Sequence, residues 1–316
     1  MLSGILQGES STRVAFHFMY ASQKVEMRNK IKKIMQMAFL VGLVISPAVA
    51  CADQNEAEAP RRVVSMNLCT DQFSMLLANK EQLVSVSRLA SDSTLSVMSE
   101  EAKAYPVNFG GAEEIYLMNP DLVIAGTYTN QTTVQMLRGL GITVVQVPPV
   151  RTISDIAKEL RRLGKVLGRE QQAEALAQQF TSEIQQLIDA QPDEQARAGV
   201  YYANGYTAGD GSLVNELITT AGLQNIANNL GLKGTSKLPL ELLILEDPQL
   251  LVEGTQFSDK PALAFELLAH PALKRTLGNS GRVMVEDKYT ICGLPFVTQA
   301  IGKLANQATK LGAQAE

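Results

Sequence analysis

Tryptophan is absent from this chain of 316 residues, and histidine (two residues) and cysteine (three) are scarce. Transition-metal sites and catalytic triads normally use histidine, but after residue 51 the chain has only His270, which we expect to be structural. No Gly-x-Ser-x-Gly elbow and no glycine-rich phosphate loop follows any predicted strand. These absences argue against a hydrolase, a nucleotide-binding protein and a bare-metal site, so we predict no catalytic residues, no metal ligands and no bound cofactor.

Positive charge is also in short supply. From Cys51 onward the chain has 22 Lys and Arg against 30 Asp and Glu, a formal charge of 22 − 30 = −8. An acidic domain repels phosphate backbones and anionic lipid surfaces, so nucleic acid is not an expected partner. No segment after residue 51 is long and apolar enough to suggest a membrane span.

The beginning of the chain resembles an export signal. Basic residues at 28, 30, 32 and 33 precede an apolar run over 34–45 and then Ala48-Val49-Ala50, the layout of a secretory signal peptide over 27–50. Met27 is a better start than Met1, and residues 1–26 are interpreted as a mis-assigned upstream extension. We therefore expect an exported protein, located in the periplasm.

Cys51 follows this signal directly and permits two readings. Ordinary signal peptidase could cleave beside it, or Cys51 could be lipidated as the first residue of a lipoprotein; lipoprotein signals usually carry leucine three residues earlier, where this chain has Ala48. Residues 51–60 are polar and are expected to form a tether. In either case the protein lies outside the cytoplasm.

Two stretches 128 positions apart are closely similar. In each, a glutamate (Glu113 or Glu241) precedes a proline (Pro120 or Pro248) by seven residues, and an apolar strand ending in Gly-Thr follows. Helix-Pro-strand junctions are common in α/β proteins, so chance is one explanation. However, a strand precedes each copy at a comparable distance, and a helical stretch and a glycine-led strand follow each. The pattern predicts one structural unit present twice, with a cleft between the copies.

Strands alternate with helical stretches on both sides of a long amphipathic segment. Such alternation predicts an α/β fold with two doubly wound lobes of mostly parallel sheet. We place the lobes at 61–151 and 196–316, with connecting helices over 152–195. The segment 170–191 carries an apolar stripe at helical spacing and would form a rigid helix about 30 Å long.

The order of these motifs resembles that of a known family. An Arg-Val-Val-Ser strand at 62–65, the helix start at 110–113, Asn119-Pro-Asp-Leu-Val-Ile-Ala125, a connecting helix and Leu238-Pro-Leu-Glu241 before Asp247-Pro248 are similar to the periplasmic binding proteins of iron-siderophore and vitamin B12 import. The resemblance covers about residues 61 to 307. It implies a monomeric receptor of the helical-backbone class that captures a small metal chelate, a ferric siderophore or a corrinoid.

The resemblance also implies a partner. In this family the receptor delivers its ligand to an ABC permease in the inner membrane, and an acidic residue on each lobe docks onto arginines of that permease. Glu113 and Glu241 match those positions, with Glu114 as a neighbour that leaves open which carboxylate points outward. A glutamate near a helix start is also favoured by the helix dipole alone.

Ligands of open α/β sheets bind outside the carboxyl ends of the strands. Tyrosine, phenylalanine, asparagine and threonine recur at those ends, which suits a bulky ligand with an apolar body and a polar edge. Because the chain has no tryptophan, ring contacts would fall to tyrosine and phenylalanine. The candidate ligand-binding residues are Asn67, Cys69, Thr70, Tyr128, Asn130, Tyr206, Phe257 and Tyr289.

Cys69 and Cys292 each follow a predicted strand, in a compartment where thiols oxidise. They are expected either to form a disulfide or to remain as two small buried thiols.

Two alternative functions stay open. Haem would need an axial tyrosine or histidine facing the cleft, which a tyrosine such as Tyr128 or Tyr206 could supply. An exported enzyme or a metallocluster-assembly protein could also be built on a similar two-lobed fold, because fold alone does not fix function.

Overall fold

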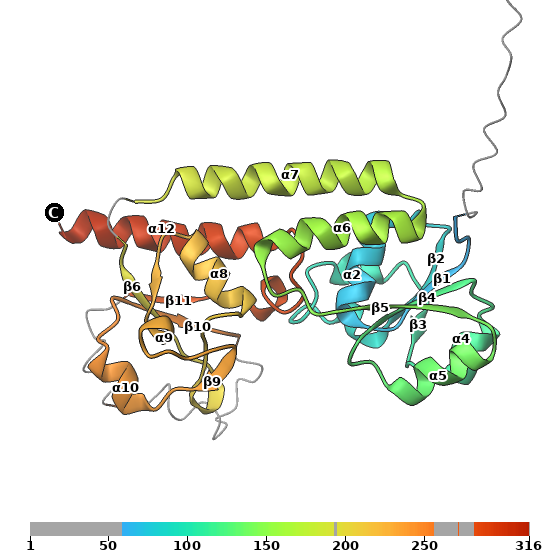
Figure 1. Ribbon diagram of the computed structural model, residues 1–316, viewed down its shortest axis with the longest axis horizontal. Helices are drawn as coiled ribbons and strands as arrows, with labels where there is room; N and C mark the ends of the chain where they lie inside the picture. Colours follow the sequence, from blue (N-terminus) through green and yellow to red (C-terminus); the bar gives the residue numbers. More distant parts are fainter. Residues whose placement is uncertain (1–58, 193–194, 256–270, 272–280, 316) are drawn as a thin grey trace, which may run out of the picture. The chain divides into compact units, whose positions relative to one another are not determined.

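The computed structural model describes residues 59–192, 195–255, 271 and 281–315, and two parallel sheets organise this part of the chain (Figure 1). The sheet of the N lobe has the strand order β3-β2-β1-β4-β5, formed by β1 (Val63–Ser65), β2 (Leu83–Ser87), β3 (Val107–Asn108), β4 (Leu122–Gly126) and β5 (Thr143–Val147). The sheet of the C lobe has the order β11-β10-β6-β8, formed by β6 (Arg197–Val200), β8 (Gln224–Asn225), β10 (Leu250–Glu253) and β11 (Gly281–Met284). The predicted α/β class with two lobes of mostly parallel sheet is confirmed.

Helices cover both sheets. Those of the N lobe are α2 (Leu68–Leu77), α3 (Ser99–Ala102), α4 (Ala112–Leu117) and α5 (Gln131–Gly139), with the 3₁₀ turn η1 (Arg88–Ser91). Those of the C lobe are α8 (Leu213–Thr220), α9 (Ile226–Asn229), α10 (Leu240–Leu245) and α12 (Val297–Ala315), with the 3₁₀ turns η2 (Ala203–Gly205) and η4 (Asp287–Tyr289).

One small sheet was not predicted from the sequence. Strands β7 (Tyr206–Ala208) and β9 (Thr235–Lys237) pair antiparallel in the C lobe. They are three residues long, too short to show a clear alternation of apolar and polar side chains.

Alternate residues of the strands contribute to different cores. In the N lobe Val63 packs with the helices shared between the lobes, whereas Val64 packs in a separate cluster with Ile115 of α4. In the C lobe Leu250 joins the shared cluster and Leu251 faces Leu243 of α10. Each sheet is therefore buried on both faces, as parallel sheets normally are.

A helical spine joins the lobes. Helix α6 (Ile153–Leu167) turns at Gly168, whose φ of +65° is left-handed, into α7 (Glu170–Asp189), and α7 runs beside α6 and α12 (Figure 1). A Cβ on Gly164 would clash with the Cβ of Ala173, so glycine allows α6 and α7 to pack closely. Because one apolar cluster runs through both lobes and these helices, the spine is a packed core and not a loose linker.

The repeated sequence corresponds to a repeated structure. When β1 is matched with β6, β4 with β10, β5 with β11 and β2 with β8, the two sheets have the same strand order, with β3 added in the N lobe. The register agrees, because Val63 pairs with Leu122 in the N lobe and Ala198 pairs with Leu250 in the C lobe, and Leu250 lies 128 positions after Leu122.

Backbone junctions repeat down to single hydrogen bonds. Asn119 and Asp247, 128 positions apart, both have a positive φ, 49° and 43°, immediately before the proline. Arg62 donates to the carbonyl oxygens of Met118 (2.6 Å) and Asn119 (2.9 Å). Arg197 donates in the same way to Glu246 (2.9 Å) and Asp247 (3.0 Å). In each lobe, then, a guanidinium group binds the carbonyls that the short helix leaves free at its C-terminus.

A buried carboxyl group lies in the N lobe. Asp71 of α2 is fully buried and accepts hydrogen bonds from the backbone nitrogen (3.1 Å) and hydroxyl (2.5 Å) of Ser87. Burial raises the pKa of Asp71 from 3.8 to about 6, although hydrogen bonds from Ser65 and Ser87 oppose the shift. The folded protein thus holds this proton more tightly than the unfolded chain does.

Because of this difference in proton affinity, the stability of the protein should depend on pH. The stabilising contribution of the Asp71 proton is complete below pH 3.8 and is lost as pH rises through about 6. Asp71→Asn should keep the hydrogen-bonding shape but remove the titration, so the variant should gain stability relative to wild type, by up to roughly 3 kcal/mol, between pH 4 and pH 7. Urea unfolding of both proteins across this range measures the difference. A difference that does not change with pH, or one equal to that of the exposed control Asp210→Asn, would contradict it.

Candidate ligand-binding cleft

A pocket of about 210 Å³ opens at the carboxyl ends of β1, β4 and β5. None of the described residues that line it is charged, and they form an apolar wall with a few amide and hydroxyl groups. The lining residues are Asn67, Cys69, Thr70, Phe73, Gly126, Thr127, Tyr128, Val147, Pro148, Pro149, Val150, Ile291 and Cys292. Most belong to the N lobe, while Ile291 and Cys292 come from the C lobe.

The floor of the pocket is fixed by the start of α2. Asn67 caps this helix, its side-chain oxygen accepting from the Cys69 nitrogen at 3.0 Å. The Asn67 amide also lies under Gly126, where a Cβ would come within 3.1 Å of it. Thr70 is fully buried and bonds Ser65 (2.7 Å) and the Asn67 carbonyl (2.9 Å). Only the side-chain oxygen of Asn67 is used within this group, so its amide nitrogen is available to a ligand. The Thr70 hydroxyl, in contrast, is used in bonds that hold the floor together.

The rim combines one exposed aromatic ring with rigid backbone. Tyr128 is 81% exposed at the pocket, more than any other large apolar side chain in the described part of the chain. Pro148 and Pro149 follow β5, and their fixed φ angles keep the opposite wall rigid. Asn130 is not among the lining residues, and its side-chain oxygen caps α5 through the Thr132 nitrogen at 2.9 Å.

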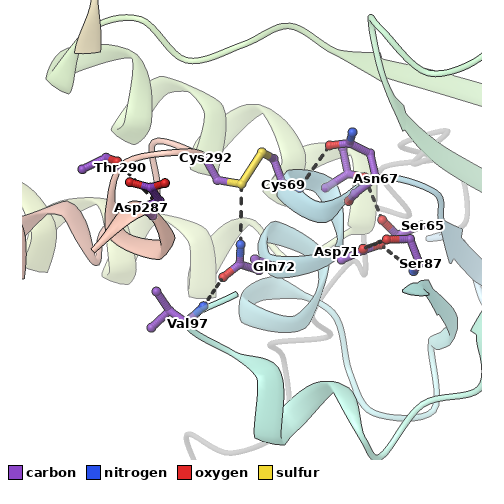
Figure 2. The surroundings of a disulfide bond; sticks show 11 residues. Ser65, Asn67, Cys69, Asp71, Gln72, Ser87, Val97, Asp287, Thr290 and Cys292 are labelled. Atoms are coloured by element: carbon purple, nitrogen blue, oxygen red, sulfur yellow. Dashed lines mark hydrogen bonds between the residues drawn. A yellow bond between two sulfur atoms is a disulfide. The ribbon is translucent and has the colours of Figure 1, made fainter. Parts of the chain in front are cut away.

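A disulfide crosses the base of the pocket and joins the two lobes. Cys69 of α2 and Cys292 are bonded, with their Cα atoms 5.0 Å apart (Figure 2). The buried Gln72 amide donates to the Cys292 sulfur at 3.6 Å and accepts from the Val97 nitrogen at 3.0 Å. Of the two states left open by the sequence, the structure contains the disulfide.

The C lobe contributes tyrosines and cations at its own strand ends. The Lys237 ammonium lies 3.8 Å from the centre of the Tyr206 ring and donates to the Asn204 carbonyl at 2.7 Å. Tyr289 lies in η4, partly buried, with the Lys288 ammonium 5.1 Å from its ring centre. Neither tyrosine lines the N-lobe pocket, so the predicted residues divide between two surfaces.

A second group in the C lobe was missed at the sequence level. A Cβ on Gly254 would meet the Tyr202 ring at 3.1 Å and the Asp287 carboxylate at 2.8 Å. The Asp287 nitrogen donates to the Thr255 hydroxyl at 2.9 Å, and burial raises the pKa of Asp287. Burial, followed by the Asp287 charge, raises the pKa of Tyr202. Tyr202 occupies the position that matches Asn67 in the repeat, and this equivalence could have identified it.

The two glutamates expected to dock form no ion pair in the described part of the chain, although the charge of Glu241 adds to the effect of burial in raising the pKa of Tyr201. Glu113 at the start of α4 and Glu241 at the start of α10 are exposed, and neither has a hydrogen bond or ion pair there. Glu114, in contrast, turns back to accept from the backbone nitrogens of Phe109 and Gly111. The carboxylate that points outward is therefore that of Glu113.

Several expectations fall beyond the described residues, namely those for Phe257, for His270 and for Cys51 with the export signal. Other lining residues were not singled out from the sequence: Pro148, Pro149 and Val150 follow a predicted strand and satisfy the same strand-end rule, whereas Ile291 gave no signal of its own.

A family model for periplasmic binding proteins matches residues 63–283, more than half of the chain. The chain belongs to this family. Its members are solute-binding components of ABC transporters and not enzymes, so the protein is a solute-binding protein. A cobalamin-binding protein of Halobacterium salinarum is 27% identical over 254 residues, 78% of this chain and 69% of that protein. A vitamin B12-binding protein of Salmonella choleraesuis is 34% identical over 119 residues, 36% of this chain and 44% of that protein.

Solved structures show the same fold. A periplasmic haem-binding protein from Roseiflexus matches with a TM-score of 0.66 and 23% identity, covering 79% of this chain and 98% of that one. A periplasmic vitamin B12-binding protein of Vibrio cholerae matches with a TM-score of 0.60 and 17% identity, covering 80% and 98%.

Two kinds of feature are absent from the described residues. No three His, Cys, Asp or Glu side chains among them are grouped so that they could hold a metal ion. No helix among them has the length and apolarity needed to cross a bilayer.

Removal of the disulfide should measurably lower the stability of the protein. It closes a loop of 223 residues, so Cys69→Ser with Cys292→Ser should lower the free energy of unfolding by roughly 4 kcal/mol. In a Cys51→Ala background, thiol titration of the denatured protein without reductant should detect no free thiol. Two titratable thiols would show that the bridge does not form.

Proposed function

We propose that this solute-binding protein carries a corrinoid. The observation that supports this most directly is the pocket wall, whose described residues are mostly apolar and carry no charge, with amide and hydroxyl groups such as those of Asn67 and Thr127. A corrin ring bears its peripheral groups largely as neutral amides, which need hydrogen-bonding partners but no counter-ions. Haem propionates and the ferric complexes of catecholate or carboxylate siderophores carry negative charge, whose desolvation in such a wall would be unfavourable.

The relatives support the same ligand. The Halobacterium and Salmonella proteins, which are similar in sequence, are named for cobalamin or vitamin B12. Haem is the second candidate, because the exposed Tyr128 hydroxyl at the pocket rim is of the type that can ligate haem iron. The two ligands place different demands on Tyr128: a ring surface suffices for a corrin, whereas haem ligation needs the hydroxyl.

We also propose that Glu113 and Glu241 dock the loaded protein onto an inner-membrane ABC permease. Their equivalence in the repeat supports this role, because two matched carboxylates fit a partner built from two equal halves. The absence of an ion pair for either glutamate among the described residues leaves both charges available for arginine or lysine of the partner.

We further propose how the chain is divided into segments. Residues 27–50 would direct export and 51–60 would tether the protein, either after cleavage or through a lipid on Cys51. The lobes would then extend over 61–151 and 196–316 with the connecting helices 152–195 between them, and a monomer would act in the periplasm.

Spectroscopic titration tests the ligand. Cyanocobalamin should bind the purified protein and shift its visible absorption, and Tyr128→Ala should weaken binding by about tenfold because a stacking ring is lost. Tyr128→Phe should bind nearly as well as wild type. Tyr116→Ala, which removes another exposed tyrosine from α4 outside the pocket, is the matched control and should have no effect.

One specific result would identify haem, and not a corrinoid, as the ligand. Haemin would give a Soret shift that Tyr128→Phe abolishes, while cyanocobalamin would give no signal. Retention of neither compound, with a ferric siderophore bound instead, would also contradict the corrinoid assignment.

Docking is tested separately from binding. Glu113→Ala with Glu241→Ala should leave the dissociation constant of the chelate unchanged and reduce its uptake into cells by more than about tenfold, because both ion pairs with the permease are lost. Glu101→Ala with Glu170→Ala, exposed glutamates of α3 and α7, is the matched control. Normal uptake by the Glu113 and Glu241 double variant would exclude the docking role.

A further inference from the structure

The matched short helices share more than a glutamate. Leu117 of α4 is 75% exposed and Leu245 of α10 is 78% exposed, and these leucines lie 128 positions apart, as Glu113 and Glu241 do. In each helix the leucine follows the glutamate by four residues, so the two side chains lie on one face, about 6 Å apart. Each lobe therefore presents the same exposed pair.

Packing within the protein does not account for this match. On the inward face of the same helices Ile115 and Leu243 also correspond, and both are fully buried, so the core requires an apolar residue there. The outward leucines make no comparable contact. Elsewhere near the helices the two copies differ, since the exposed Phe109 corresponds to Lys237 and Glu114 to Leu242.

The geometry of both helices is held in the same way. Arg62 binds the carbonyls of the two residues that follow α4, and Arg197 binds those of the two residues that follow α10. Both helices lie away from α7, on the other side of their sheets from the spine (Figure 1). Two equal surfaces on rigid supports are thus available to one partner.

We propose that Leu117 and Leu245, together with Glu113 and Glu241, form a two-part docking surface for a membrane partner with two-fold symmetry. Each half of that partner supplies a cation for the glutamate and, one helical turn away, an apolar recess for the leucine. This inference rests on the proposed docking function and adds the apolar part of the contact. The unpaired carboxylates specify a basic partner, and the duplication specifies that its two halves are alike.

The leucines should contribute to docking and not to ligand binding. Buried apolar anchors beside charged pairs often carry much of an interface's affinity. Leu117→Ala and Leu245→Ala should each lower chelate uptake by roughly threefold to tenfold, to a similar extent, and the double variant by more than tenfold. Ile188→Ala, an exposed apolar side chain on α7, is the control and should leave uptake unchanged.

The assay follows uptake of radiolabelled cyanocobalamin, or haemin if the titration assigns haem, into cells whose own copy of the gene is replaced by each variant. Dissociation constants of the purified variants and their amounts in the periplasm are measured alongside. Loss of uptake in the leucine variants with unchanged affinity and amount supports the inference. Loss in the glutamate double variant but not in the leucine variants would overturn it and leave the proposed docking intact. Loss in neither would overturn both.

Discussion

The structure depends on a junction that occurs twice. In each lobe an arginine at the start of the first strand, Arg62 or Arg197, binds the carbonyls of a left-handed residue, Asn119 or Asp247, and of the residue before it. The following proline prevents the helix from continuing, so the chain must turn into the central strand. The strand that carries one wall of the cleft and the helix that carries Glu113 or Glu241 are therefore fixed by the same contact.

The connection between the lobes is stiff. A single apolar cluster passes from both sheets into α6, α7 and α12, and the disulfide between Cys69 and Cys292 adds a covalent link at the base of the pocket. Glu216 of α8 further accepts from the Ile153 nitrogen at the start of α6, at 2.8 Å. With these constraints, we expect small adjustments of the lobes around a ligand and not a wide opening. A rigid receptor would also keep the two proposed docking surfaces at a constant separation, which suits recognition by one two-fold partner.

Much of this architecture could be predicted from the sequence because its helices and strands follow from the regular spacing of apolar residues. The repeat around Glu113 and Glu241, the stripe from Ala173 to Ile184 and the strands before Gly126 and Gly254 all have the periods of their elements. The residues of the site were harder to predict from the sequence. Asn130, predicted to contact ligand, caps α5 with its side-chain oxygen and is not among the residues that line the pocket, and its local pattern does not reveal this. Ile291 enters the pocket only because the lobes pack together, and neither its pairing with the N lobe nor the bond between the cysteines follows from any local pattern.

The central claim is that the two halves of the repeat enclose one ligand at the carboxyl ends of their strands. A crystal structure of the protein with cyanocobalamin tests this most directly. The account predicts the corrin ring against Tyr128 and the Pro148-Pro149 wall, with C-lobe residues such as Tyr206 on its other side. A corrin bound away from the ends of β1, β4 and β5, or held by one lobe alone with the other half of the repeat facing elsewhere, would contradict it.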